Sequence, residues 1–473
     1  VDQSTVNLGG NLTVDSASVT TATATVGVTS VSLGFIAAAV SGSAATATIL
    51  PTSEAYVNDS DVAADDITIE ATAQPKATTF GRGFSVSTGA SVGVSRGAVT
   101  VRPAINAWIG GAGTTIAADS LTVTARHDLP SVGPTASASA VGSAGGLLLG
   151  VDATLTSAEN FAAVSSYVAD RTTLDIDGLT RITAANTTHQ YADASSNAFG
   201  LIAAGVTKAT AIADTTTLAY LGTGVSLTGG GLTIEATGHD TNYAQTTAGA
   251  AGGISVAAAR PRTENITEVT AEIRDGAAGR EIHLGGGDLL VKSMHTASFN
   301  SRVMANAGGF LSGAGADSDH NIVSDVTAAV GADVRVRARQ IDMSARNLVS
   351  KPAAESIPDF GDSNIKGSAK ALVGLAGAFS DTLLTLRTVV DVGSHARLEA
   401  GSGLPFSNDD LIHLAAYNQI TGTDKVTFNA AGLGAAATVS SNFLTLVDLS
   451  TVNIGSGAEL VSSGAINISA RGS

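Results

Sequence analysis

Cysteine is absent from this chain of 473 residues, and aromatic residues, charged residues and proline are all scarce. Without cysteine there can be no disulfide framework, and because large secreted eukaryotic proteins usually carry disulfides, the absence favours a bacterial product. Aromatic residues make up 4% of the chain, which excludes a core built from bulky rings. Only nine prolines occur, so Pro-rich linkers between a row of small independent β-sandwiches are not expected.

Charge is low in amount and one-sided in sign. Charged residues make up 14% of the chain and the net charge is −16. An acidic surface repels phosphate backbones, so we expect no nucleic-acid partner. The most apolar runs, residues 33–40 and 145–151, are too short to span a bilayer, so we expect no membrane span. The chain begins at Val1 without a basic segment or signal-peptide core, and we interpret it as a section of a longer polypeptide.

A five-residue phrase with alternating apolar and polar positions returns nine times along the chain. Its copies occupy residues 12–16, 67–71, 121–125, 180–184, 232–236, 289–293, 341–345, 412–416 and 466–470. The starts are 55, 54, 59, 52, 57, 52, 71 and 54 residues apart. The alternation indicates a strand with one buried face, and the regular spacing indicates a repeat architecture.

Each unit of roughly 54 residues has the same internal order. Alternating runs flank a tract rich in glycine and alanine, and turn residues follow a short apolar pair upstream of the next phrase. One unit cannot bury its small apolar face alone, whereas stacked units bury a continuous core. We therefore predict an all-β, β-helix-like solenoid of about eight units, continuous over residues 1–473, with each unit forming either one wide coil or two coils. Two insertions, residues 351–366 and 401–408, are predicted to be surface loops.

The phrase and the residues before it resemble a known class of repeats. The matching segments are DSLTVTA at residues 119–125, GGLTIEA at 230–236 and GDLLVKS at 287–293. They are similar to repeats of large secreted bacterial filamentous adhesins, the leukotoxin-type and filamentous-haemagglutinin-like β-helical proteins. The resemblance implies an elongated, secreted, surface-attached β-solenoid, and it carries no catalytic or binding residue onto this chain.

Two sets of side chains recur at fixed places in the unit. One set follows the phrase and suggests either a histidine metal ladder or turn residues that bond the backbone: His127, Asn186, His239, His295, Asn347 and Asn418. The other set is aromatic and suggests either a sugar-binding platform or a structural ladder: Tyr56, Trp108, Tyr167 and Tyr220. We favour the structural interpretation for both sets.

Acidic pairs are the remaining candidates for chemistry. Asp59 with Asp61, and Asp317 with Asp319, are candidate calcium ligands in what we interpret as turns rich in glycine and aspartate, and GAGAD at residues 313–317 faintly resembles a calcium-binding repeat. No metalloprotease, serine-hydrolase or phosphate-loop motif occurs in the sequence. We predict no catalytic residues and no cofactor, with calcium as the one open alternative.

These patterns support three hypotheses of function. The first is a non-enzymatic structural or adhesive rod, part of an extracellular filament or biofilm matrix at a bacterial cell surface. Its expected partners are other copies of itself, associated end to end or laterally, or neighbouring repeats of the same chain, with glycans of the cell surface or matrix as a further option. The second is a polysaccharide-acting β-helix lyase or hydrolase, which a groove of clustered Asp, Arg and His would support. The third is a calcium-binding matrix protein.

Overall fold

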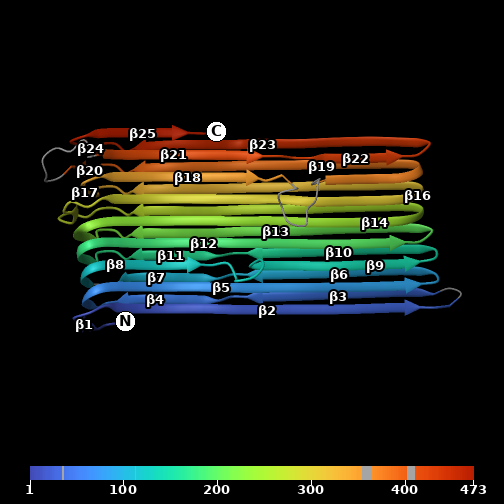
Figure 1. The fold of residues 1–473 in the computed structure, drawn as a ribbon, viewed down its shortest axis with the longest axis horizontal. Coiled ribbons are helices and arrows are strands. Elements are labelled where there is room, and N and C mark those ends of the chain that lie inside the picture. The colour runs from blue at the N-terminus through green and yellow to red at the C-terminus, as the bar shows by residue number, and fades with distance from the viewer. Residues whose placement is uncertain (35–36, 112, 354–364, 402–410, 473) are drawn as a thin grey trace.

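Parallel β-strands form almost the whole molecule in the computed structural model (Figure 1). The structure describes residues 1–34, 37–111, 113–353, 365–401 and 411–472. These described residues form 25 strands and no helix, which confirms the predicted all-β class. No helix among them could cross a membrane.

Each repeat runs out along one long wall, turns at a tip, and returns along a second wall. The outgoing strands are β2 (Leu12–Ser32), β5 (Asp61–Ser87), β8 (Thr115–His127), β9 (Ala136–Gly146), β12 (Thr173–Phe199), the first parts of β14 (Ser226–Ile273) and β16 (Leu289–Val330), β18 (Ile341–Lys351), the start of β19 (Ile365–Val392), β21 (Leu411–Gly422), β22 (Val426–Ala431) and β25 (Ala465–Arg471). In Figure 1 the tips lie along the right-hand margin.

The return wall and a short third wall complete each layer. The return strands are β3 (Ala38–Ile49), β4 (Thr52–Asn58), β6 (Ala90–Val101), β7 (Ala104–Gly110), β10 (Leu149–Asn160), β11 (Ala163–Val168), β13 (Ile202–Leu221), the later parts of β14, β16 and β19, and β23 (Gly434–Ile454). The short wall consists of β1 (Thr5–Asn7), the starts of β5, β8, β12 and β14, and β15 (Ile282–Leu284), β17 (Arg335–Ala338), β20 (Arg397–Ala400) and β24 (Glu459–Ser462).

The hydrogen-bonded register follows the repeat spacing read from the sequence. The first residues of the nine phrases pair in one continuous parallel column: Leu12, Ile67, Leu121, Thr180, Leu232, Leu289, Ile341, Ile412 and Ile466. Ladder partners therefore lie one repeat apart, and each unit contributes one layer of the stack, not two. The layers follow the order of the sequence from bottom to top in Figure 1.

Large aliphatic side chains fill the interior at one end of every layer. There the outgoing, return and short walls enclose a single hydrophobic cluster, to which one layer contributes Ile67 and Ile69 from the outgoing wall, Ile109 from the return wall and Ile116 from the short wall. All four are fully buried. We call this part the three-walled end.

Small residues fill the rest of the interior, where only the outgoing and return walls face each other. A Cβ atom on Gly81 would lie 2.7 Å from the carbonyl oxygen of Arg96, and one on Gly97 would lie 2.8 Å from that of Ser139. Glycine lets the two backbones approach this closely. Alanine dominates the buried apolar residues here, together with buried serine and threonine. We call this part the two-walled end.

The two predicted insertions lie largely outside the described residues. Of residues 351–366 the structure describes the two ends, and of residues 401–408 it describes only Gly401. Lys351, which we placed in a surface loop, is the last residue of β18, and its side chain is buried. Alternation continues to the end of that strand, so its last side chain points inward.

Candidate functional site

Five of the six polar residues after the phrase form one buried column. The register stacks His127, Asn186, Gly238, His295, Asn347 and Asn418 in successive layers. His239 does not belong to it, because the neighbouring Gly238 takes the inward position and His239 faces outward. The interpretation of all six as one recurring set was therefore wrong at His239, which lies one residue further from the start of its phrase than the other five do.

His127 illustrates the contacts that this column makes. Its Nδ1 lies 2.7 Å from Oδ1 of Asn186, so a neutral imidazole donates to the amide oxygen. Burial lowers the pKa of His127 to about 4, and the bond to Asn186 only partly opposes that. No group of metal ligands forms along this column among the described residues. The contacts favour a structural role over a metal ladder. The prediction of turn residues that bond the backbone was wrong, because His127 and Asn186 lie within strands and bond each other's side chains.

A serine, a histidine and an aspartate in the same region resemble a hydrolase triad in their order of contacts. Nδ1 of His295 lies 2.7 Å from the hydroxyl of Ser324, and Nε2 lies 3.1 Å from Oδ2 of Asp240. Burial alone would raise the pKa of Asp240, but hydrogen bonds from His295, Thr188 and Thr267 outweigh it, so the net shift is downward. All three triad-like side chains are buried, so a substrate cannot reach them. The group links side chains of neighbouring layers inside the protein.

A buried ion pair between Lys351 and Asp424 joins two distant segments. Nζ of Lys351 lies 2.5 Å from Oδ1 of Asp424 and 3.0 Å from the hydroxyl of Thr382. Burial lowers the pKa of Lys351, and the carboxylate of Asp424 acts against that shift. Ser380 and Ser441 donate hydrogen bonds to the other oxygen of Asp424. The pair anchors the turn after β21 to the layer below.

The aromatic column is a stack of rings. Ring centroids of Tyr56, Trp108, Tyr167 and Tyr220 are 4.9, 5.9 and 4.6 Å apart in order, and the planes diverge by at most 9°. The guanidinium of Arg274 covers the last ring at 3.6 Å. Since the rings cover one another's faces, the platform that a sugar would need is occupied. The geometry favours the structural ladder over sugar binding.

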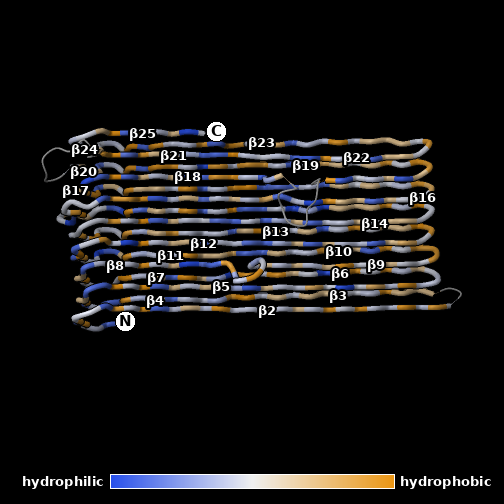
Figure 2. The backbone as a smooth tube through the Cα atoms, in the orientation of Figure 1, coloured by the Kyte–Doolittle hydropathy of each residue, from blue (hydrophilic) through white to orange (hydrophobic). Residues whose placement is uncertain are grey.

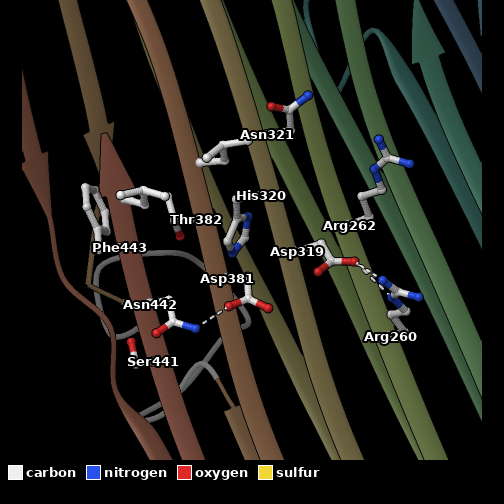
Figure 3. Close-up of a pocket in the computed structure, with 12 residues that line it drawn as sticks. Arg260, Arg262, Asp319, His320, Asn321, Asp381, Thr382, Ser441, Asn442 and Phe443 are labelled. Atoms are coloured by element: carbon white, nitrogen blue, oxygen red, sulfur yellow. Dashed lines mark hydrogen bonds and ion pairs between the residues drawn. The ribbon is translucent and has the colours of Figure 1, made fainter. Parts of the chain in front are cut away.

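A shallow groove of about 940 Å³ on the return wall is lined by arginine and aspartate side chains (Figure 3). Nε of Arg260 lies 3.3 Å from Oδ2 of Asp317 and 2.9 Å from Oδ2 of Asp319. One oxygen each of Asp317, Asp319 and Asp381 lies within 4.8 Å of the others. Burial, followed by the charge of Asp319, raises the pKa of Asp317. Asn442 donates a hydrogen bond of 2.7 Å to Asp381.

Of the candidate calcium ligands, Asp317 and Asp319 come together with Asp381 in a group that could hold a metal ion, whereas Asp59 and Asp61 lie elsewhere. Asp317 and Asp319 lie within β16, not in a turn, so the predicted glycine-rich calcium loop is wrong there. Asp59 lies in a turn with φ of 45°, and Asp61 begins β5. Neither belongs to a group of three potential ligands within the described part of the chain.

The sequence hypotheses missed Arg260 and Asp381, although the repeat spacing contains the signal for Arg260. Asp319 pairs with Arg262 in the layer below and with Asp381 in the layer above. Aligning the units on their phrases stacks Arg260 on Asp317 and Arg262 on Asp319, but it misses Asp381, because residues 351–366 lengthen that unit between its phrase and Asp381. His320 also lines the groove, but its ring nitrogens bond Thr263 and Ser318 in the interior. Burial holds the pKa of His320 well below its ordinary value, so the groove has no exposed titrating imidazole at this position.

Comparison with protein-family models, curated proteins and solved structures gives no match for this chain. The interpretation of function therefore depends on the repeat, the register and the chemistry of the groove. These features describe a repetitive all-β protein with inter-layer polar contacts.

Proposed function

We propose that the chain is a section of a β-solenoid that acts as a non-enzymatic extracellular rod or fibre segment. The observation that carries this proposal is the single parallel column in which all nine phrases pair, from Leu12 to Ile466. Continuous backbone ladders along the stack resist bending and stretching, because every layer is bonded to the next at many residues. The proposed role is mechanical, with adhesion at the outward faces.

The charges of the groove support a structural role over an enzymatic one. Arg260 bridges Asp317 and Asp319, so two of the three carboxylates share an ion pair with one cation of the protein itself. A glycosidase needs one free carboxyl as acid and another as base or nucleophile across the scissile bond. The Ser324–His295–Asp240 group is buried. A polysaccharide-acting enzyme and a calcium-binding matrix protein remain the alternatives.

Self-association is part of the proposal. Among the described strands, β2 pairs only with β5, and β23 pairs through a ladder only with β19. Each therefore presents a free backbone edge, which adds further strands readily. The partner on these edges would be neighbouring repeats or another copy of the chain. The expected location, a bacterial surface or its matrix, follows from the adhesin-like phrase and the absence of cysteine.

Electron microscopy of the purified chain, at several concentrations and with or without calcium, tests the proposal. Particles of uniform width that lengthen along the stack as concentration rises would support a rod or fibre subunit. Compact globular particles with a melting curve strongly dependent on calcium would instead favour the matrix-protein alternative. Release of sugars from polysaccharide mixtures, abolished by Asp381→Asn, would overturn the non-enzymatic proposal.

A further inference from the structure

Exposed apolar side chains form a column along the tips of the layers. The register places them one above another in successive repeats: Leu148, Leu201, Gly253, Phe310, Leu372 and Leu433. The five apolar members are between 37% and 91% exposed. Figure 2 shows hydrophobic colouring at turns along the right-hand margin, where these tips lie.

A second apolar column lies directly beside the first. Ile202, Ile254, Leu311 and Val373 pair in register and are each at least 40% exposed. We call the two columns together the tip stripe. Within the tip segments 147–149, 199–202, 251–254, 308–311, 370–373 and 431–434, Lys370 is the one charged residue.

The apolar side chains of the tip stripe do not contribute to the chain's own core. Glycines beside it lie against neighbouring layers, so that a Cβ on Gly150 would collide with the carbonyl of Phe199 in the layer above, and one on Gly309 with the carbonyl of Gly252 in the layer below. The interior at the tip has no space for a large side chain. Leu201, Phe310 and Leu433 therefore project into solvent, and an exposed apolar strip of this kind marks an interaction surface.

We propose that the tip stripe is a lateral docking surface for a second copy of this chain. The stripe repeats at the strand spacing of about 4.8 Å. An identical stripe, turned antiparallel by a two-fold axis, has the same repeat and the same apolar character. The net charge of −16 makes copies repel elsewhere, so contact is favoured where charge is nearly absent. This proposal goes beyond the rod function, since a single rod needs no contact at its side.

The size of the stripe predicts how strong the pairing is. Six layers span about 24 Å at the strand spacing. A strip of that length and two side chains wide covers less than the roughly 800 Å² per partner that a stable dimer buries. We therefore expect weak side-by-side pairing that depends on concentration and strengthens as layers are added.

The test compares the full chain with a stripe variant and a matched control. The stripe variant, Leu201→Glu with Phe310→Glu, places charges on the docking surface. The control, Thr68→Glu with Thr216→Glu, adds the same charge at outward positions on the two long walls away from the tips. Equal melting temperatures and circular dichroism spectra would establish that all three proteins fold.

Sedimentation velocity and electron microscopy then measure the pairing. We expect the unaltered chain and the control to form side-by-side pairs, and the stripe variant to need at least a tenfold higher concentration. Equal pairing by the stripe variant, or an unaltered chain that stays single at about 100 µM, would overturn the proposal. So would single particles that float with neutral lipid vesicles through the stripe, because the surface would then bind membrane. Single rods in the stripe variant leave the rod function intact.

Discussion

The three-walled and two-walled ends of each layer solve the same burial problem with opposite side chains. At the three-walled end, Ile109 and Ile116 belong to the same buried cluster as Ile69, and large aliphatic side chains fill the space between the three walls. At the two-walled end, glycine at positions such as Gly205 lets one backbone contact the other. The three-walled end is stabilised by large side chains that fill its interior. The two-walled end is stabilised by the absence of side chains at glycine positions, which lets the walls pack closely. Substitutions should therefore have opposite effects at the two ends.

Introducing a charge at the three-walled end should have the largest effect. Val123 is fully buried between Ile69 and Ile182 of the neighbouring layers. We expect Val123→Asp to destabilise the protein by about 4 kcal/mol or more, because an unpaired carboxylate would be buried among aliphatic groups. Urea unfolding followed by circular dichroism measures this loss.

The matched control for that charge is its outward neighbour. Thr122 is half-buried on the outer face of the same strand and pairs with Arg181. Thr122→Asp should change stability by less than about 1 kcal/mol, since its charge remains solvated beside a cation. Equal unfolding curves for the two variants would contradict the register assigned to this strand.

Removing volume at the three-walled end should have the next largest effect. Ile109 is fully buried, whereas Ile266 is 41% exposed on the return wall. Ile109→Ala leaves a cavity and should cost about 2–5 kcal/mol. The same change at Ile266 should cost less than about 1 kcal/mol, because no cavity forms. If both variants lost equal stability in urea unfolding, the aliphatic cluster of the three-walled end would not be the main source of stability.

The repeat explains why the register was predictable and why the side-chain networks were not. Alternation and spacing alone placed Tyr56 above Trp108 and Ile341 beside Ile412, because pairing in a stack of repeats follows sequence offset. Whether each unit forms one layer or two could be decided only from the structure, because the sequence repeat has the same length in both cases. The burial of Lys351 needed the structure too, because its partner, Asp424, lies in a turn that no periodic pattern positions.

Errors in the candidate site have a similar cause. Asp317 and Asp319 were interpreted as turn residues because glycine and aspartate usually form turns. In this fold, glycine-rich tracts continue as strands where the walls approach each other, so β16 runs straight through the pair. Local composition therefore indicated a loop, and the close packing of the two walls determined a strand.

Adding volume at the two-walled end should reverse the pattern seen with isoleucine. Gly205 faces inward, and a methyl group there would overlap the carbonyl oxygen of Gly249 on the opposite wall. We expect Gly205→Ala to cost about 1–3 kcal/mol, because the walls must separate. Gly315 has open space around its Cβ position, so Gly315→Ala should be neutral or slightly stabilising. Equal, near-zero effects in urea unfolding would contradict the close approach of the walls.

Asp152 offers the test with the smallest expected effect, because its carboxylate occupies the space that Gly93 and Gly142 leave free. It pairs with Gly93 and Gly205 in adjacent layers, and a Cβ on Gly142 would collide with its carboxylate. Burial raises the pKa of Asp152 to about 6, and a hydrogen bond from Thr154 only partly opposes this. The unfolded value is about 3.9, so ionisation destabilises the fold progressively from about pH 4 to pH 6 and fully above that.

Asp152→Asn removes this cost and should therefore stabilise the protein in one pH range only. We expect a gain of about 1 kcal/mol at pH 8 and no gain near pH 3.5, where the native carboxyl is protonated in both states. Asp214→Asn, at an exposed position on β13, should show no such dependence on pH. A gain that is larger in acid than at pH 8 would contradict a buried, uncompensated carboxyl. The two-walled end would then tolerate charge as well as small polar groups, and its close packing would not limit which side chains it can hold.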